Sequence, residues 1–155
     1  MVRLISAATG GSCWFVSTHL AVNIANEETI RLAQSRDAIR LISQRSTADR
    51  VVILADLNDV LTTSGVRKVF AAAGYNHLRA RLSDEAMTGD SRNTFNGWKL
   101  TKREGKWIDD VLTSPDVKPY VGTVFLTDTS AFSVHASDHN GVRASVSFLD
   151  QLPTP

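Results

Sequence analysis

The chain has 155 residues, a formal net charge of +1, 43% hydrophobic residues and 21% charged residues, which are values typical of an ordinary globular protein. The length indicates about one domain, which we expect to span residues 1–150, with 151–155 as a frayed tail. The charge gives no general argument for binding to nucleic acid or membranes, and no apolar run approaches the ~18 residues of a membrane span. The single Cys13, expected to be buried in a strand, excludes an internal disulfide and a multi-cysteine metal site. The N-terminal sequence does not resemble a secretory signal, and the sequence leaves localisation open.

The first half of the chain predicts a hairpin, a helix and a strand. Apolar runs at 2–6 and 13–19, separated by AATGG, are typical of a β-hairpin. Residues 26–45 predict a helix with Glu27 and Glu28 at its positive end. The run VVILA (51–55) predicts a strand buried on both faces. The helix has an apolar set, Ile30, Ala33, Ala38, Leu41 and Ile42, and a set expected on a solvated face, Arg31, Arg36 and Arg40.

The second half predicts a helix followed by strands. A helix is expected over 64–73, ending at Gly74, and a polar loop over 83–96. Strands are expected at WIDDVLTS (107–114), VGTVFLT (121–127) and VRASVSF (142–148). Strands with intervening helices indicate a layered α/β domain.

Polar residues gather at the ends of these strands. His19 ends the apolar run FVSTHL (15–20), where a histidine is either a packed side chain or a substrate contact. In ADLND (55–59), Asp56 and Asn58 would project in the same direction from an extended chain and suit the holding of a water and a phosphate oxygen. The alternative for Asp56 and Asn58 is an Asx turn that closes the strand.

Two further motifs extend this pattern. Asp109 lies among apolar residues, so it either needs a hydrogen-bonding partner or faces solvent from an edge strand. In HASDHNGVRASV (135–146), Asp138 can bind a hard cation, and His139 can contact or protonate a leaving phosphate oxygen. The order TH, DxN, ID and SDH, each at a strand end, is difficult to obtain by chance. No GxSxG motif supports a serine hydrolase.

These motifs resemble the endonuclease/exonuclease/phosphatase superfamily of metal-dependent phosphoesterases. The resemblance covers nearly the whole chain and implies an α/β fold (α+β in some schemes), namely part of a four-layer α/β/β/α sandwich with the site at the top of the sheets. The matching segments are STHL (17–20), VVILADLND (51–59), NTFNGW (93–98), WIDDVLTS (107–114) and ASDHNGV (136–142).

The resemblance also implies a role for each residue. His19 would contact the scissile phosphate, Asp56 would orient or deprotonate the attacking water, and Asn58 would hold the phosphate or that water. Asp138 would bind Mg²⁺ or Mn²⁺. Asp109 would hydrogen-bond His139 and favour its charged form, so that His139 stabilises charge in the transition state.

The chain departs from the family pattern in several places. Ala55 and Leu57 replace the usual glycine and aromatic residue, and Asp110 replaces an aromatic residue, so that it points outward or perturbs Asp109. Residues 1–18 contain no asparagine or acidic residue, whereas the first half of the family fold supplies an asparagine and a metal-binding glutamate. The chain therefore resembles a C-terminal half, and an uncovered sheet face would favour self-association or pairing with a missing N-terminal half.

Two functions follow from the resemblance. The first is hydrolysis of a phosphodiester, nuclease-like, by an activated water; the alternative is a non-catalytic remnant that acts at most as a binding piece. Asn96 and Trp98 are candidates for substrate contact. The basic residues of the same stretch suit either a nucleic-acid backbone or a solvated hairpin: Lys99, Lys102, Arg103 and Lys106.

Overall fold

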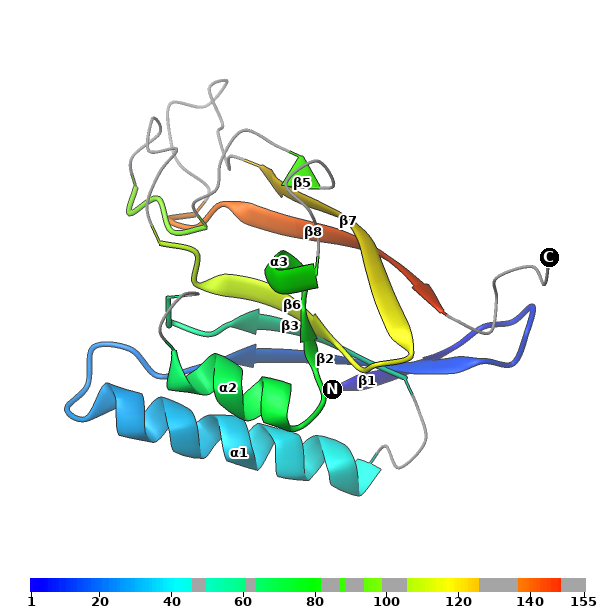
Figure 1. Ribbon diagram of the computed structural model, residues 1–155, viewed down its shortest axis with the longest axis horizontal. Coiled ribbons are helices and arrows are strands. Elements are labelled where there is room, and N and C mark those ends of the chain that lie inside the picture. Colours follow the sequence, from blue (N-terminus) through cyan, green and yellow to red (C-terminus); the bar gives the residue numbers. More distant parts are fainter. Residues whose placement is uncertain are drawn as a thin grey trace.

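Two β-sheets stack on one another in the computed structural model (Figure 1). The structure describes residues 1–45, 50–60, 64–81, 87–88, 94–98, 106–125 and 137–148. The larger sheet has the order β1-β2-β3-β6-β4, with β2 and β3 parallel and the other neighbours antiparallel. Its strands are β1 (Val2–Ile5), β2 (Ser12–His19), β3 (Arg50–Asp56), β4 (Asn76–His77) and β6 (Asp109–Thr113). The smaller sheet has the order β5-β7-β8, formed by β5 (Met87–Thr88), β7 (Val117–Phe125) and β8 (Gly141–Phe148).

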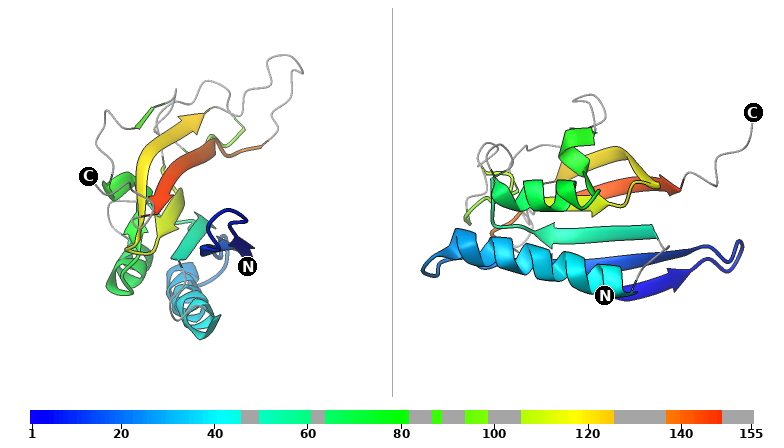
Figure 2. Two further views of the ribbon diagram at one scale, coloured as in Figure 1. Left: turned by 90° about the vertical axis from the view of Figure 1, so that its right-hand side faces the viewer. Right: turned by 60° about the horizontal axis from the view of Figure 1, so that its bottom comes forward.

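Two helices cover the face of the larger sheet that is turned away from the smaller sheet (Figure 2). These are α1 (Glu27–Arg45), between the parallel strands β2 and β3, and α2 (Gly65–Ala72). Ser64 caps α2 by accepting a hydrogen bond from the backbone N–H of Arg67. A single turn, α3 (Leu78–Arg81), follows β4. The described residues thus form a helix layer and two sheet layers of the predicted sandwich.

A hydrophobic core lies on each face of the larger sheet. Alternate residues of the strands point to opposite faces, so one set packs against the helices and the other against the smaller sheet. The helix-side core includes Val16, Ile53, Leu112, Ile42 and Phe70. The core between the sheets includes Cys13, Val52, Val111, Val117 and, partly buried, Phe148.

The sequence predicted most of these elements, and the fold class is confirmed. The hairpin, both long helices and the main strands lie within a few residues of their expected bounds, and Cys13 is buried in β2. The sequence did not predict β4 or α3, and β5 lies inside the expected loop 83–96. The tail 151–155 lies outside the described residues. None of the helices described has the length and apolarity that would let it cross a membrane.

Three expectations about burial were wrong. Arg31 is only 7% exposed because its side chain lies under the turn that follows β2, not on a solvated face. Leu41 and Ala33, both expected on the apolar side of α1, are exposed. Strand β3 is not buried on both faces, since the smaller sheet leaves Leu54 48% exposed.

Candidate active site

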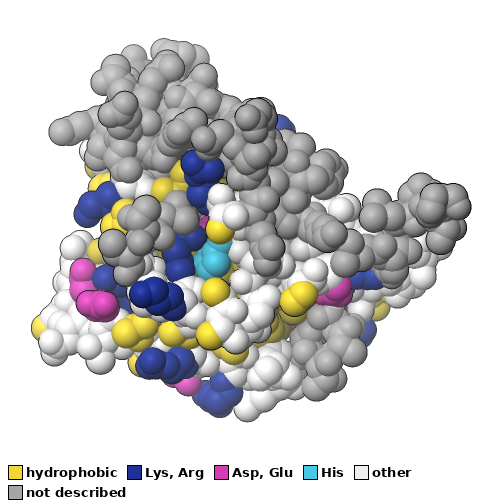
Figure 3. Space-filling model, viewed as in Figure 1, with side chains coloured by type: hydrophobic (Ala, Val, Ile, Leu, Met, Phe, Trp, Pro, Cys, Tyr) yellow, Lys and Arg dark blue, Asp and Glu magenta, His cyan; other side chains and the backbone are white. Residues whose placement is uncertain are grey.

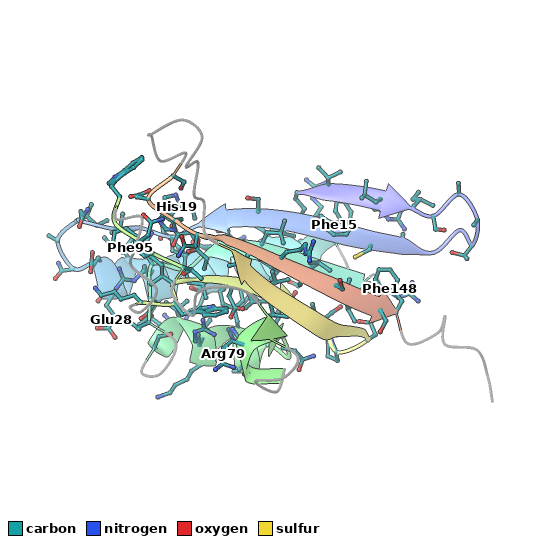
Figure 4. The ribbon with its side chains drawn as sticks, turned by 90° about the horizontal axis from the view of Figure 1, so that it is seen from above. Phe15, His19, Glu28, Arg79, Phe95 and Phe148 are labelled. Atoms are coloured by element: carbon teal, nitrogen blue, oxygen red, sulfur yellow. The ribbon has the colours of Figure 1, made fainter. Side chains whose placement is uncertain are left out.

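Three of the predicted site residues form a row across neighbouring strands. His19 pairs with Asp56 in the parallel register of β2 and β3, and Asp56 pairs with Asp109 in the antiparallel register of β3 and β6. Directly paired residues project from the same face of a sheet. The three side chains therefore lie together at one end of these strands, on the side facing the smaller sheet. His139 reaches this row from the segment that enters β8. Figure 4 shows His19 and Phe95 at this same end of the molecule.

The predicted hydrogen bond between Asp109 and His139 is present. His139 Nδ1 lies 2.8 Å from Asp109 Oδ2, and its ring packs edge-on against Phe95. Burial lowers the pKa of His139, but the hydrogen bond to Asp109 and the charges of Asp109, Asp56 and Asp138 outweigh it, so the pKa is raised. Burial raises the pKa of Asp109, against hydrogen bonds from His139 and Thr94 that lower it.

Asp56 stands between the two histidines. Its Oδ2 lies 3.3 Å from His19 Nε2 and 3.8 Å from His139 Nε2. His19 is the most exposed of the three side chains, whereas Asp56 and His139 are partly buried. A carboxylate in this position can hold a water molecule while both imidazoles remain available to a substrate.

Asn58 takes part in a turn and also faces the site. Its backbone N–H donates to Asp56 Oδ1 at 2.9 Å, which is the Asx turn expected as the alternative. Its side-chain Nδ2 donates to the carbonyl of Leu20 at 2.9 Å, and its φ of 48° lies in the left-handed region that asparagine tolerates. The DxN motif therefore forms an Asx turn and also lines the pocket, so the two interpretations of its sequence are compatible.

A pocket of about 470 Å³ opens beside these residues. Five of the eight predicted site residues line it: His19, Asp56, Asn58, Asp138 and His139. Lys106, expected in the basic stretch, also lines it. Sequence reasoning did not place the remaining lining residues in the site, because they come from the turn after β2, from α1 and from segments adjoining the strands: Val22, Asn23, Glu27, Val60, Phe95 and Ile108.

Asn96 and Trp98 do not line this pocket. Asn96 is 3% exposed; its Nδ2 donates to Asn140 Oδ1 at 3.1 Å, and its Oδ1 accepts from the N–H of Trp98 at 2.8 Å. Asn96 thus fixes the local backbone, while the Trp98 side chain is 60% exposed. The basic residues Lys99, Lys102 and Arg103 lie outside the described residues.

Thr94 supports the candidate site, and the sequence analysis did not single it out. It is fully buried, and its Oγ1 accepts hydrogen bonds from the N–H groups of Ile108 at 2.8 Å and Asp109 at 3.0 Å. The backbone N–H of Asn140 donates to the Thr94 carbonyl at 2.7 Å. Thr94 therefore joins the segments that carry Asp109 and His139, and its place in NTFNGW was the only available signal.

Asp110 neither points to solvent nor joins the site. Because β6 lies between β3 and β4, it is not an edge strand, and Asp110 points to the helix side. There its Oδ2 accepts from Arg67 Nη1 at 2.8 Å and contacts His77 Nδ1 at 2.9 Å. Both alternatives that involved solvent, for Asp109 and for Asp110, are thereby corrected.

The donor set of the pocket fits a hard divalent cation. Asp56 and Asp138 are carboxylates that line it, and Mg²⁺ often binds through one or two carboxylates with water and substrate completing its ligands. Among the described residues, ligand atoms of Asp56, Asp109 and His139 also lie within 4.8 Å of one another. Since His139 is already bonded to Asp109, the carboxylates are the better ligands for Mg²⁺ or Mn²⁺.

Solved structures with a similar fold are known, although no match was found at the level of sequence. No family model matches the sequence, and no curated protein matches it. Among solved structures, an endonuclease/exonuclease/phosphatase from Bacteroides vulgatus has a TM-score of 0.77 at 18% identity over 94% of this chain and 53% of its own. A mannosyl-6-phosphatase from Bacteroides thetaiotaomicron has a TM-score of 0.73 at 18% identity, over 93% of this chain and 54% of its own. D. rerio TDP2, in complex with a single-strand DNA product, has a TM-score of 0.66 at 18% identity, over 90% of this chain and 58% of its own.

Sequence identities this low establish similarity of fold alone. The share of the chain that is matched also differs between this protein and the solved structures. Nearly the whole chain matches, but it spans only about half the length of the solved structures. The chain therefore has the fold of the endonuclease/exonuclease/phosphatase family, as its motifs predicted, over about half the length of the members it matches.

Proposed function

We propose that the chain carries the catalytic residues of a metal-dependent phosphoesterase that hydrolyses a phosphodiester in a nuclease-like reaction. The observation that carries this proposal is a pocket lined by His19, Asp56 and His139, in which Asp109 holds His139 from behind and Asp56 lies between the two histidines. A positioned water, fixed donors to phosphate oxygens and a carboxylate cation site are the requirements of in-line phosphoryl transfer.

Each side chain then has a distinct part in the reaction. Asp56 orients the attacking water and takes its proton, while the turn through Asn58 keeps the Asp56 carboxylate in place. The exposed His19 contacts a phosphate oxygen. His139, held by Asp109 and with a raised pKa that favours its charged form, stabilises the negative charge that builds up as the bond to the leaving oxygen breaks. A bound Mg²⁺ or Mn²⁺, with Asp138 as a ligand, would offset charge on the phosphate.

The substrate class is supported by the family fold and by the surface near the pocket. The matched structures include a phosphatase and a protein bound to a single-strand DNA product. Lys106 lines the pocket and can contact a second phosphate, and the exposed Trp98 can stack on a base. On the face seen in Figure 3, however, the described Lys and Arg side chains are spread out rather than gathered in one block. The proposal of a nucleic-acid substrate therefore depends on Lys106 and Trp98 near the pocket, not on a large basic surface.

A non-catalytic binding piece is the second candidate. It is favoured by the share of the fold present, since the chain spans about half the length of the structures it matches. Such a piece would bind a phosphate-containing ligand in the same pocket without turning it over.

Nicking of supercoiled plasmid, with hydrolysis of bis(p-nitrophenyl) phosphate alongside, tests the first candidate. We expect activity that requires Mg²⁺ or Mn²⁺ and stops on addition of a chelator. His139→Ala and Asp138→Ala should lower it by about 100-fold or more, the scale of a lost acid–base group. Asp37→Ala, at an exposed position of α1, serves as the matched control and should behave as wild type.

The outcomes separate the candidates. Plasmid cleavage without turnover of the small diester would identify nucleic acid as the substrate. Equal activity in the wild type and both variants, or activity that persists in chelator, would contradict the proposed site. Saturable binding of inorganic phosphate without hydrolysis of either substrate would favour the binding piece.

A further inference from the structure

The turn that follows β2 is held by three side chains of α1. Gln34 Oε1 accepts from the N–H of Ala21 at 2.9 Å, and Arg31 Nη1 donates to the carbonyl of Ala21 at 3.2 Å. Glu27 Oε2 accepts from the N–H of Asn23 at 2.9 Å, and Glu27 Oε1 lies 3.3 Å from Arg31 Nη1. Three successive contacts therefore fix the backbone of residues 21–23.

The helix presents these side chains because of their spacing. Positions 27, 31 and 34 are separated by four and three residues, so they lie on one face of α1. Arg31 is in the middle and is buried, which is expensive for a cation unless its charge is paired and hydrogen-bonded. Within the turn, Asn23 has a φ of 57°, a backbone conformation that is uncommon for residues other than glycine.

The same turn is connected to the catalytic row by its first residue. Leu20 donates its N–H to the carbonyl of Asp56 at 2.9 Å, and its own carbonyl accepts from Asn58 Nδ2 at 2.9 Å. Val22 and Asn23, further along the turn, line the pocket. A displacement of Ala21 would therefore move a wall of the pocket and the acceptor that orients the Asn58 side chain.

We propose that Arg31 is a positioning residue of the active site, acting with Glu27 and Gln34 through the turn 20–23 on Asn58. This inference rests on the proposed phosphoesterase function for its effect on turnover, but its effect on the Asn58 side chain is independent of that function. Arg31 touches no reacting atom, so its removal acts on alignment, and misplacement by about 1 Å can cost about 100-fold in rate.

The test compares Arg31→Met with Arg36→Met, a matched substitution at an exposed position of the same helix. Rates with bis(p-nitrophenyl) phosphate should show kcat lowered between about 10- and about 100-fold in Arg31→Met and unchanged in Arg36→Met. Arg31→Lys should recover part of the loss, because an ammonium group can still donate to the Ala21 carbonyl. Gln34→Met, which removes one contact at an exposed position, provides a milder variant if Arg31→Met folds poorly.

A second readout is the hydrogen exchange of the Asn58 side-chain amide, measured by NMR on the metal-free protein. The Asn58 Nδ2 protons should exchange faster in Arg31→Met, while the backbone amides of Ile53 and Leu112 in the core keep their protection. Parallel loss of protection in the core, or an unchanged Asn58 signal, would overturn the positioning role. An inactive wild type with the expected Asn58 response would contradict the proposed function and support the positioning role.

Discussion

His139 is the residue whose charge depends most directly on its neighbours. Asp109 binds its Nδ1, and Asp56 and Asp138 add negative charge nearby, so its pKa is raised despite partial burial. A raised histidine pKa means that the imidazolium is fully present at low pH and is lost as the pH rises through the raised value. His139 should therefore remain charged at a pH where an unperturbed histidine is already neutral.

NMR titration of the metal-free protein checks this at the level of the residue. The His139 pKa should lie above the ordinary value of about 6.5 in the wild type and fall in Asp109→Asn, because the amide keeps the shape but removes the charge. Asp116→Asn, which alters a half-exposed carboxylate paired with Arg50, is the control and should leave the titration unchanged. A His139 pKa that is equal in wild type and Asp109→Asn would show that the hydrogen bond does not govern its charge.

Residues that adjoin a strand end could be predicted, and those that reach the site through tertiary contacts could not. His19, Asp56 and His139 each follow or precede an apolar run, so their position at the sheet edge is visible in the sequence. Glu27 looked like an ordinary acidic residue at a helix start, and Thr94 like a loop residue, because their partners lie across the fold.

At the scale of the elements, Asp110 joins α2, β4 and β6. Its side chain is fully buried and contacts Arg67 of α2 and His77 of β4, while His77 Nε2 lies 3.2 Å from the Arg67 carbonyl. Burial lowers the pKa of Arg67, and the Asp110 charge opposes this by favouring the guanidinium. Removal of Asp110 would leave that buried cation without its principal counter-charge.

Chemical denaturation of Asp110→Asn tests this connection between the elements. The free energy of unfolding should fall by about 3–5 kcal/mol, the cost of breaking a buried ion pair from one side. Asp116→Asn, at a half-exposed carboxylate, should change it by at most about 1 kcal/mol. A loss in Asp110→Asn as small as that in Asp116→Asn would mean that packing, not the ion pair, holds α2 to β6.

The length of an element decided whether the sequence could reveal it. The two longer helices have acidic residues or a serine cap at the start, and they extend over two turns or more, which is enough for an apolar spacing to be visible. Strand β4 has two residues and α3 has four, too few for any periodicity. Strand β4 exists because Asn76 and His77 pair with Thr113 and Leu112 of β6, which lie far along the chain. The exposure of Leu54 could not be predicted from the sequence either, since it depends on how far the smaller sheet extends over β3.

At the scale of the whole molecule, the smaller sheet covers only part of the larger one. Seen from above, β7 and β8 do not extend over β1 (Figure 4). Val2 and Leu4 pair with Phe15 and Cys13 and share their face, yet they remain 58% and 54% exposed, and Leu54 nearby is 48% exposed. This apolar surface continues the core between the sheets and favours association with another chain.

Light scattering over a range of concentrations tests the association. The mass of the wild type should rise above the 16.9 kDa of one chain, and Val2→Thr/Leu4→Thr should reduce the rise. Ile5→Thr is the matched control, because Ile5 is 63% exposed on the opposite face of β1. A wild type that stays at the mass of one chain throughout, or an equal effect of Ile5→Thr, would exclude self-association through this face.

The adjacent carboxylates of β6 make the two faces of this strand unusually alike. Asp109 lies opposite Asp56 on the side of the smaller sheet, and Asp110 lies opposite Ala55 on the helix side. A slip of one residue against β3 would exchange the faces, bringing Asp110 to the pocket and Asp109 toward Arg67, with apolar residues following on both sides. Polarity therefore discriminates weakly between the two alignments of β6. Two other features favour the observed alignment. The fully buried Leu112 fills the helix-side core, and Thr94 Oγ1 accepts from the N–H groups of Ile108 and Asp109.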